Sequence, residues 1–236
     1  MSGPALALAF FDAAHELHGT VRTGAALLFE HGRASSPPGE AEVSAAGEGY
    51  RALVEGSLEL SFLPLSPPLE LGGSYAQVCA VSGTVKGTAL DCVGTLVETT
   101  VAPAWAELDA FRSLSALWDA ETALLATLRR PRGASGHGEE HATAWLVHDG
   151  VPVLVEKTRL STVYDGSGRQ RSAGLELWLP DQDLPRRAAG RALGGTSLEL
   201  DPGLRVNVAV FEWRMEGRPG QGLYELTVRD EPAEAA

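Results

Sequence analysis

Hydrophobic and polar residues alternate along most of the chain, which is the pattern of β-strands with one buried face. The clearest runs are "GSLELSFLPL" (56–65), "RVNVAVFEWRME" (205–216) and "GLYELTVRD" (222–230). In the first run, apolar residues such as Leu58 alternate with polar residues such as Glu59. The pattern therefore predicts strands in both halves of the chain.

Turn residues separate these runs. Asp149 and Gly150 lie between two apolar stretches in "WLVHDGVPVLVE" (145–156), which is the strongest hairpin signal in the chain. "YDGSGRQ" (164–170) predicts another tight turn. Two further segments are loops by composition, "GRASSPPGEAE" (32–42) and "RPRGASGHGEE" (130–140). Many short strands between such turns predict an all-β fold, an antiparallel barrel or sandwich with little helix.

Two segments depart from this alternation. "AWAELDAFRSLSALWDAETALLATLRR" (104–130) places Trp105, Leu108 and Phe111 at helical spacing. "PDQDLPRRAAGRAL" (180–193) is predicted to be a short helix or a loop with exposed arginines. Taken alone, the local pattern favours helix in the first segment.

The charge balance restricts the partners. The chain has 236 residues, enough for one large or two small domains, and 44% of them are hydrophobic. Its 31 acidic residues outnumber 19 basic ones, for a net charge of −12. Binding to nucleic acid or to anionic membranes depends on Lys and Arg, so we expect neither a nucleic-acid partner nor membrane insertion. The expected partner is a neutral or apolar small molecule, or another protein.

The apolar run "ALALAFF" (5–11) is too short to span a bilayer, and no positive charge precedes it. Asp12 and His15 follow where a signal-peptide cleavage site would lie. We interpret the run as a strand, and we expect a cytoplasmic protein. In that compartment Cys79 and Cys92, the only cysteines, are expected to be buried thiols rather than a disulfide.

The segment "DAAHELHG" (12–19) places Asp12, His15 and His18 at regular spacing. One interpretation is a metal site, and the other is a polar loop closed by Gly19 with a histidine at the mouth of a pocket. An extended chain would point His15 and His18 to opposite faces. We therefore favour the loop, predict no metal, and keep His15 as a candidate catalytic acid or base.

A second histidine-rich segment, "GHGEEHATAWLVHDG" (136–150), contains His137, Glu139, Glu140, His141 and His148. Their order is not the helical HExxH of zinc peptidases, so we expect solvated loop residues. The chain contains no nucleophile elbow, dinucleotide fingerprint or P-loop. No cofactor is expected.

The large aromatic residues are mostly candidates for the core. In a barrel some of them would also line a ligand cavity, because large apolar walls suit an apolar ligand. The candidate ligand-binding residues are Trp105, Phe111, Trp118, Trp145 and Trp213.

Four segments recur together in the order of a known family: "FFDAAHELHGTVRTG" (10–24), "GSLELSFLPLSPPLEL" (56–71), "YAQVCAVSGTVKGTALDCVGT" (75–95) and "FEWRMEGRPGQGLYELTVRD" (211–230). As a set they resemble the lipocalin-like family that includes carotenoid 1,2-hydratase (hydroxyneurosporene synthase) and AttH-like proteins. The resemblance implies two calycin-type β-barrels side by side, residues 1–104 and 105–236. It also implies strands in 104–130, and apolar isoprenoid or polyketide substrates that are hydrated, cyclised or isomerised.

The chain departs from this family in two ways. It is short for two complete barrels, so strands must be missing or one half must be open. Relatives carry a polar Arg-Asp-His-Ser-Trp-Gly type motif after "CVGT", where this chain reads "LVETTVAPAW" (96–105) and keeps only Glu98 as an ionisable group. Alternation puts Glu98 on the face of Leu96 and Thr100. In an apolar lining its neutral form would be favoured and could act as a general acid; on a half-exposed strand it would point to solvent.

Three functions remain open. The first is a cofactor-independent hydratase, cyclase or isomerase with Glu98 and His15 as catalytic residues. The second is a non-catalytic carrier of an apolar ligand, and the third is a structural or interaction protein with a filled core. An ionisable group inside a cavity would favour the enzyme, a wholly apolar cavity the carrier, and a core without a void the third.

Overall fold

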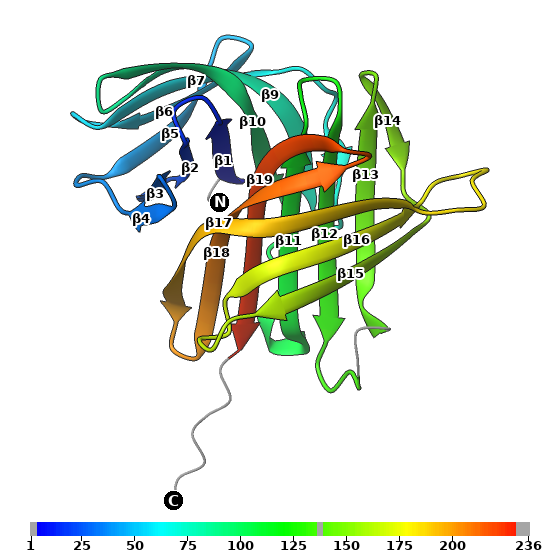
Figure 1. Ribbon diagram of the computed structural model, residues 1–236. Coiled ribbons are helices and arrows are strands. Elements are labelled where there is room, and N and C mark those ends of the chain that lie inside the picture. The colour runs from blue at the N-terminus through cyan, green and yellow to red at the C-terminus, as the bar shows by residue number, and fades with distance from the viewer. Residues whose placement is uncertain (1–3, 136–138, 230–236) are drawn as a thin grey trace, which may run out of the picture.

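The computed structural model describes residues 4–135 and 139–229. Within these ranges the chain forms two curled antiparallel sheets that pack against each other (Figure 1), plus one short 3-10 helix, η1 (Trp105–Glu107). The all-β prediction is confirmed. None of the described residues belongs to a helix long and apolar enough to cross a bilayer.

The first sheet has the strand order β4-β3-β2-β1-β10-β9-β7-β6-β5, with β8 paired to β9. Its strands are β1 (Ala5–Asp12), β2 (Leu17–Arg22), β3 (Ala25–Glu30), β4 (Arg33–Ser35), β5 (Ala41–Ala46), β6 (Gly49–Val54), β7 (Leu58–Pro64), β8 (Leu69–Glu70), β9 (Ser74–Val85) and β10 (Thr88–Thr99).

The second sheet has the order β14-β13-β12-β11-β19-β18-β17-β16-β15. Its strands are β11 (Leu108–Leu117), β12 (Ala123–Pro131), β13 (His141–His148), β14 (Val151–Leu154), β15 (Lys157–Tyr164), β16 (Gln170–Trp178), β17 (Arg186–Asp201), β18 (Leu204–Met215) and β19 (Arg218–Arg229).

The two sheets share one topology. In each, the first strand pairs with the last, β1 with β10 and β11 with β19, and the strand order on either side is the same apart from the short β8. Each sheet keeps two edge strands, β4 and β5 in one and β14 and β15 in the other. Both halves are therefore open half-barrels, which accounts for the short chain.

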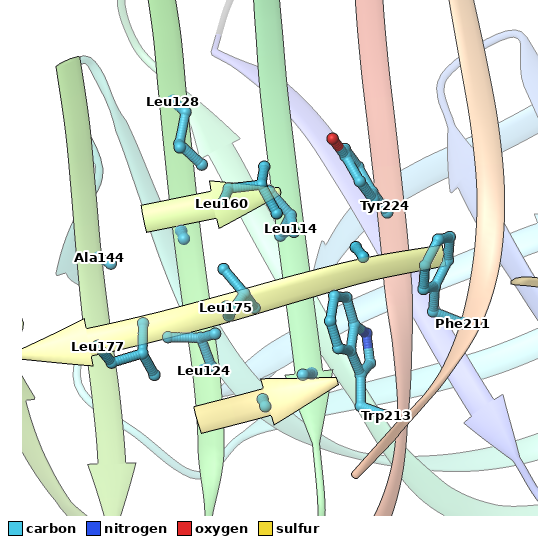
Figure 2. Close-up of a cluster of buried hydrophobic side chains, with 14 of the residues drawn as sticks. Leu114, Leu124, Leu128, Ala144, Leu160, Leu175, Leu177, Phe211, Trp213 and Tyr224 are labelled. Atoms are coloured by element: carbon cyan, nitrogen blue, oxygen red, sulfur yellow. The ribbon is translucent and has the colours of Figure 1, made fainter. Parts of the chain in front are cut away.

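Three apolar clusters hold these sheets together. The concave face of each sheet encloses its own core, and the central strands of both sheets meet back to back along a seam. The N-terminal core includes Leu8, Phe10, Leu60, Phe62 and Leu96. The C-terminal core, drawn in Figure 2, includes Leu114, Leu124, Phe211, Trp213 and Tyr224. The seam core includes Phe11, Phe29, Leu125, Val208 and Leu223.

The predicted turns are present. Asp149 and Gly150 have φ angles of 50° and 74°, as a two-residue type I′ hairpin requires, and they connect β13 to β14. The segment 164–170 connects β15 to β16. The segment predicted as a loop at 32–42 is a loop only in its middle, because Arg33–Ser35 forms the edge strand β4.

Residues 104–130 form η1, β11 and most of β12, so the strands implied by the family resemblance are confirmed and the helical pattern was misleading. The reason is that β11 is covered on both faces. Leu114 packs in the C-terminal core, while its neighbour Ser115 faces the seam and is also buried. A strand buried on both sides loses its alternation, and its apolar residues can then fall at helical spacing by coincidence.

The prediction of a helix or loop at 180–193 is wrong from residue 186 onward, because Arg186–Asp201 forms β17. Two of its three arginines pair with acidic residues directly opposite on neighbouring strands: Arg187 with Glu176 on β16, at 3.2 Å, and Arg191 with Glu212 on β18, at 2.8 Å. Such cross-strand pairs make a charged segment compatible with a sheet. The partners lie far away in the sequence, so the local pattern does not reveal them.

Both cysteines are free thiols, as expected. Cys79 on β9 lies opposite Gly94, and Cys92 on β10 lies opposite Val81. Burial raises the pKa of each thiol to about 12, so neither is a nucleophile at neutral pH.

Candidate functional site

A cavity of about 180 Å³ lies in the seam between the two sheets. Its walls come from central strands of both sheets, and on β10 and β19 the lining residues alternate along the strand. On β10 the residues Thr95, Val97 and Thr99 face the cavity, and on β19 the residues Leu223, Glu225 and Thr227 do so. Most of the remaining wall is alanine, leucine and valine, so the cavity is largely apolar.

Two predicted aromatic residues lie at this cavity. Trp105 of η1 and Phe111 of β11 pack edge to face, with ring centroids 5.8 Å apart and an interplanar angle of 89°. The guanidinium carbon of Arg129 lies 5.9 Å from the centroid of the Phe111 ring, within cation–π range. Trp105 and Phe111 thus form an aromatic part of the wall, and the Arg129 guanidinium contacts the Phe111 ring.

One ion pair lines the cavity. Arg22 Nη2 on β2 donates to both carboxylate oxygens of Glu225 on β19, each at 2.6 Å, and so joins the two sheets. The Glu225 side chain is 14% exposed and that of Arg22 is 43% exposed. Among the described lining residues, Glu225 is the only carboxylate.

Several of the hydroxyl groups in the wall are engaged within the protein. Thr127 Oγ1 donates to the carbonyl of Leu71 at 3.0 Å, and Ser115 Oγ accepts from the backbone N–H of Leu223, also at 3.0 Å. A ligand therefore meets chiefly apolar surface, with the Arg22–Glu225 pair as the charged exception.

The two predicted catalytic residues lie away from this cavity. Glu98 on β10 is half-buried and shares a face with Leu96 of the N-terminal core, opposite the face that carries Val97. His15 lies in the turn between β1 and β2, with a side chain that is 51% exposed. The catalytic roles of both residues stay predictions.

The segment around His15 is a polar turn. Asp12 Oδ2 lies 2.7 Å from His15 Nδ1, and Asp12 Oδ1 accepts the backbone N–H groups of Ala14 and His15. Burial opposes the charge of Asp12, but these hydrogen bonds outweigh it and lower the pKa of the carboxyl. Gly19 does not close the turn. It lies inside β2, where a Cβ would be 2.6 Å from the Phe10 ring.

His18 also lies inside β2 and is buried. Asp12 pairs with His15 and not with His18, so the three residues do not converge on one point. Across the described residues, no group of three or more His, Cys, Asp or Glu side chains is arranged to hold a metal ion.

The other predicted aromatic residues occupy different places. Trp145 Nε1 donates to the carbonyl of Glu70 at 2.8 Å and so connects the two sheets. Trp213 is fully buried in the C-terminal core, stacked 5.2 Å from Phe211. Trp118 lines a second cavity, at another part of the seam.

The histidine-rich segment is not entirely solvated. His137 lies outside the described residues, and His141 is exposed. Glu140, in contrast, has a side chain that is 4% exposed and forms an ion pair with Arg112, whose side chain is 3% exposed. The expectation of a solvated residue is wrong for Glu140.

Sequence comparison identifies no relative: no family model matches the chain, and no curated protein matches it. Three solved structures share its fold over nearly the whole length. They are an AttH-type protein of Nitrosomonas europaea (14% identity, TM-score 0.65, 95% of this chain and 92% of that chain), kievitone hydratase of Nectria haematococca (9%, 0.62, 97% and 89%) and CghA (12%, 0.67, 98% and 90%). At these identities the likeness concerns the fold, and the AttH match agrees with the resemblance seen in the sequence.

Proposed function

We propose that this chain binds an apolar small molecule of the isoprenoid or polyketide type in the cavity between its two sheets. The observation that carries the proposal is the largely apolar cavity of about 180 Å³ in the seam. A structural or interaction protein would be expected to have a filled core at this place. A dry cavity of about 150 Å³ is enough for benzene. One ring or one prenyl unit therefore fits inside.

The binding prediction is tested by filling the cavity. Val97→Phe adds a ring to its wall and is expected to weaken the binding of n-butylbenzene, a neutral apolar probe, by at least ~10-fold. Affinity is measured by saturation-transfer difference NMR. The matched control is Val163→Phe on β15, since Val163 is 56% exposed and lines no described cavity.

The wild-type protein and the control should bind the probe equally. Equal binding by Val97→Phe, or absence of binding by the wild-type protein, would contradict the proposal. A saturable site that survives in Val97→Phe would place the apolar ligand elsewhere in the protein.

A second candidate function is catalysis on the same ligand by hydration, cyclisation or isomerisation. The observation that favours it is Glu225, a carboxylate in a largely apolar cavity. Two hydrogen bonds from Arg22 orient this carboxylate. In a hydration that starts from a carboxylate, Glu225 removes a proton from the water that adds to one alkene carbon, and the resulting carboxyl group returns that proton to the other carbon. The name of kievitone hydratase, which shares the fold, supports this chemistry.

If Glu225 is catalytic, we expect Glu225→Gln to keep the affinity for n-butylbenzene within about twofold. Turnover should fall by at least ~100-fold, which is the rate enhancement that one general acid or base usually contributes. Turnover is measured by mass spectrometry on a panel of prenylated phenols and linear polyenes, as a gain of water or a change of retention time. The substitutions Glu98→Gln and His15→Ala test the residues predicted from sequence in the same assay. If only these two lower turnover, the reaction does not use the cavity carboxylate.

A further inference from the structure

A second cavity, of about 580 Å³, lies at a different part of the seam and shares no lining residue with the first. The β1–β2 and β3–β4 turns of one sheet meet β17, β18, β19 and the end of β11 of the other around it. The wall is mixed: Phe11, Leu117 and Leu193 are apolar, and polar or charged side chains, His18 among them, make up the rest.

His18 is the unusual member of this wall. It is 3% exposed, and its neighbours in register on the adjacent strands are Phe11 and Phe29. Within the described residues His18 forms no hydrogen bond or ion pair, and its Nδ1 is inaccessible to solvent. A buried polar side chain without a partner is costly and therefore uncommon, so its persistence calls for an explanation.

The charges around His18 indicate what kind of partner suits it. Burial lowers the pKa of His18 to about 4, although the nearby carboxylates Asp12 and Glu16 raise it, so the ring is neutral at pH 7. A neutral imidazole has one N–H donor and one bare nitrogen acceptor. The charged groups in the lining are already paired, Glu16 with His31 at 2.7 Å and Arg191 with Glu212 at 2.8 Å.

We propose that the second cavity is a binding site for a neutral molecule with an apolar body and an uncharged oxygen, a hydroxyl or carbonyl, that hydrogen bonds to His18. The apolar part of the wall, such as Phe11, Leu117 and Leu193, suits the body, and His18 binds the oxygen. Because Nδ1 is inaccessible, the oxygen pairs with Nε2, and a hydroxyl can do so in either tautomer of the ring because it both donates and accepts. An anion is disfavoured by Asp12 and Glu16, and by the net charge of −12.

The test compares 2-naphthol with naphthalene, which differ by one hydroxyl. In protein labelled with 15N in its histidines, saturating 2-naphthol is expected to shift the His18 ring signals, and naphthalene to shift them little. The affinity for 2-naphthol is expected to fall at least tenfold in His18→Phe, which keeps a flat ring and removes the nitrogens. His141→Phe is the matched control, because His141 is exposed and lines no described cavity.

The variant Val97→Phe distinguishes binding in this second cavity from binding in the apolar cavity. Val97→Phe is expected to leave the 2-naphthol shift of His18 unchanged, even if the first proposal fails. If His18→Phe does not fold, Leu193→Trp narrows the same cavity, leaves His18 in the sequence, and should reduce the shift. The proposal is overturned if 2-naphthol leaves the His18 signals unmoved, if naphthalene binds equally well, or if His18 shows contacts to water only.

Discussion

Replacing Arg112 by leucine is expected to destabilise the protein by about 3–5 kcal/mol, the cost of breaking a buried ion pair from one side. The side chains of Arg112 and Glu140 are 3% and 4% exposed and meet at 2.5 Å. Arg112 Nη2 also lies 3.4 Å from the hydroxyl of Tyr164. Loss of the arginine leaves a buried carboxylate without this cation, and desolvation of that carboxylate is the main penalty.

The measurement is urea unfolding at pH 7. Arg112→Leu combined with Glu140→Leu should recover most of the lost stability, because a buried pair replaced by apolar residues is often nearly neutral. Arg51→Leu is the control: its partner is Glu59 at 2.6 Å, the two side chains are 45% and 60% exposed, and an exposed pair contributes about 0–1 kcal/mol. A single Arg112→Leu variant as stable as Arg51→Leu would contradict the prediction.

This pair illustrates what the sequence pattern does not reveal. Alternation identified the strand at 56–65 because one of its faces packs on a core and the other is exposed. The strands at 205–216 and 222–230 were also identified, although the seam core covers one face of each and the C-terminal core covers the other. Arg112 and Glu140 are charged residues that alternation assigns to solvent. Their burial is possible because they form an ion pair in the folded chain. Since 28 positions separate them, the local sequence pattern does not reveal this pair.

The candidate site was predictable to a similar extent. Trp105 and Phe111 were identified as ligand-binding candidates, and both line the apolar cavity. Arg22 and Glu225 were missed, since 203 positions separate them and each looks like an ordinary polar position of an alternating strand. For Glu98, alternation correctly predicted that its side chain lies on the same face of the strand as Leu96. Which of the two faces meets the seam depends on how the sheets pack, and that information is not local.

Acidification from pH 7 to pH 4 is expected to cost about 3 kcal/mol of stability through His18 alone, because burial lowers the pKa of this side chain in the folded protein. The pKa of His18 is about 4 in the folded protein, below its ordinary value of 6.5. As pH falls below 6.5 the unfolded chain therefore binds the proton first. The contribution is fully present above pH 6.5 and is lost progressively toward pH 4.

This dependence is measured by urea unfolding at steps between pH 7 and pH 4, comparing the wild-type protein with His18→Phe and His141→Phe. His141→Phe should follow the wild-type slope, because His141 is exposed. His18→Phe should lose about 3 kcal/mol less than the wild-type protein over this interval, since only the titration of His18 has been removed. Asp12 acts at lower pH, because its pKa is lowered below its ordinary value of 3.8. Identical slopes in all three proteins would mean that His18 is not buried as a neutral ring in solution.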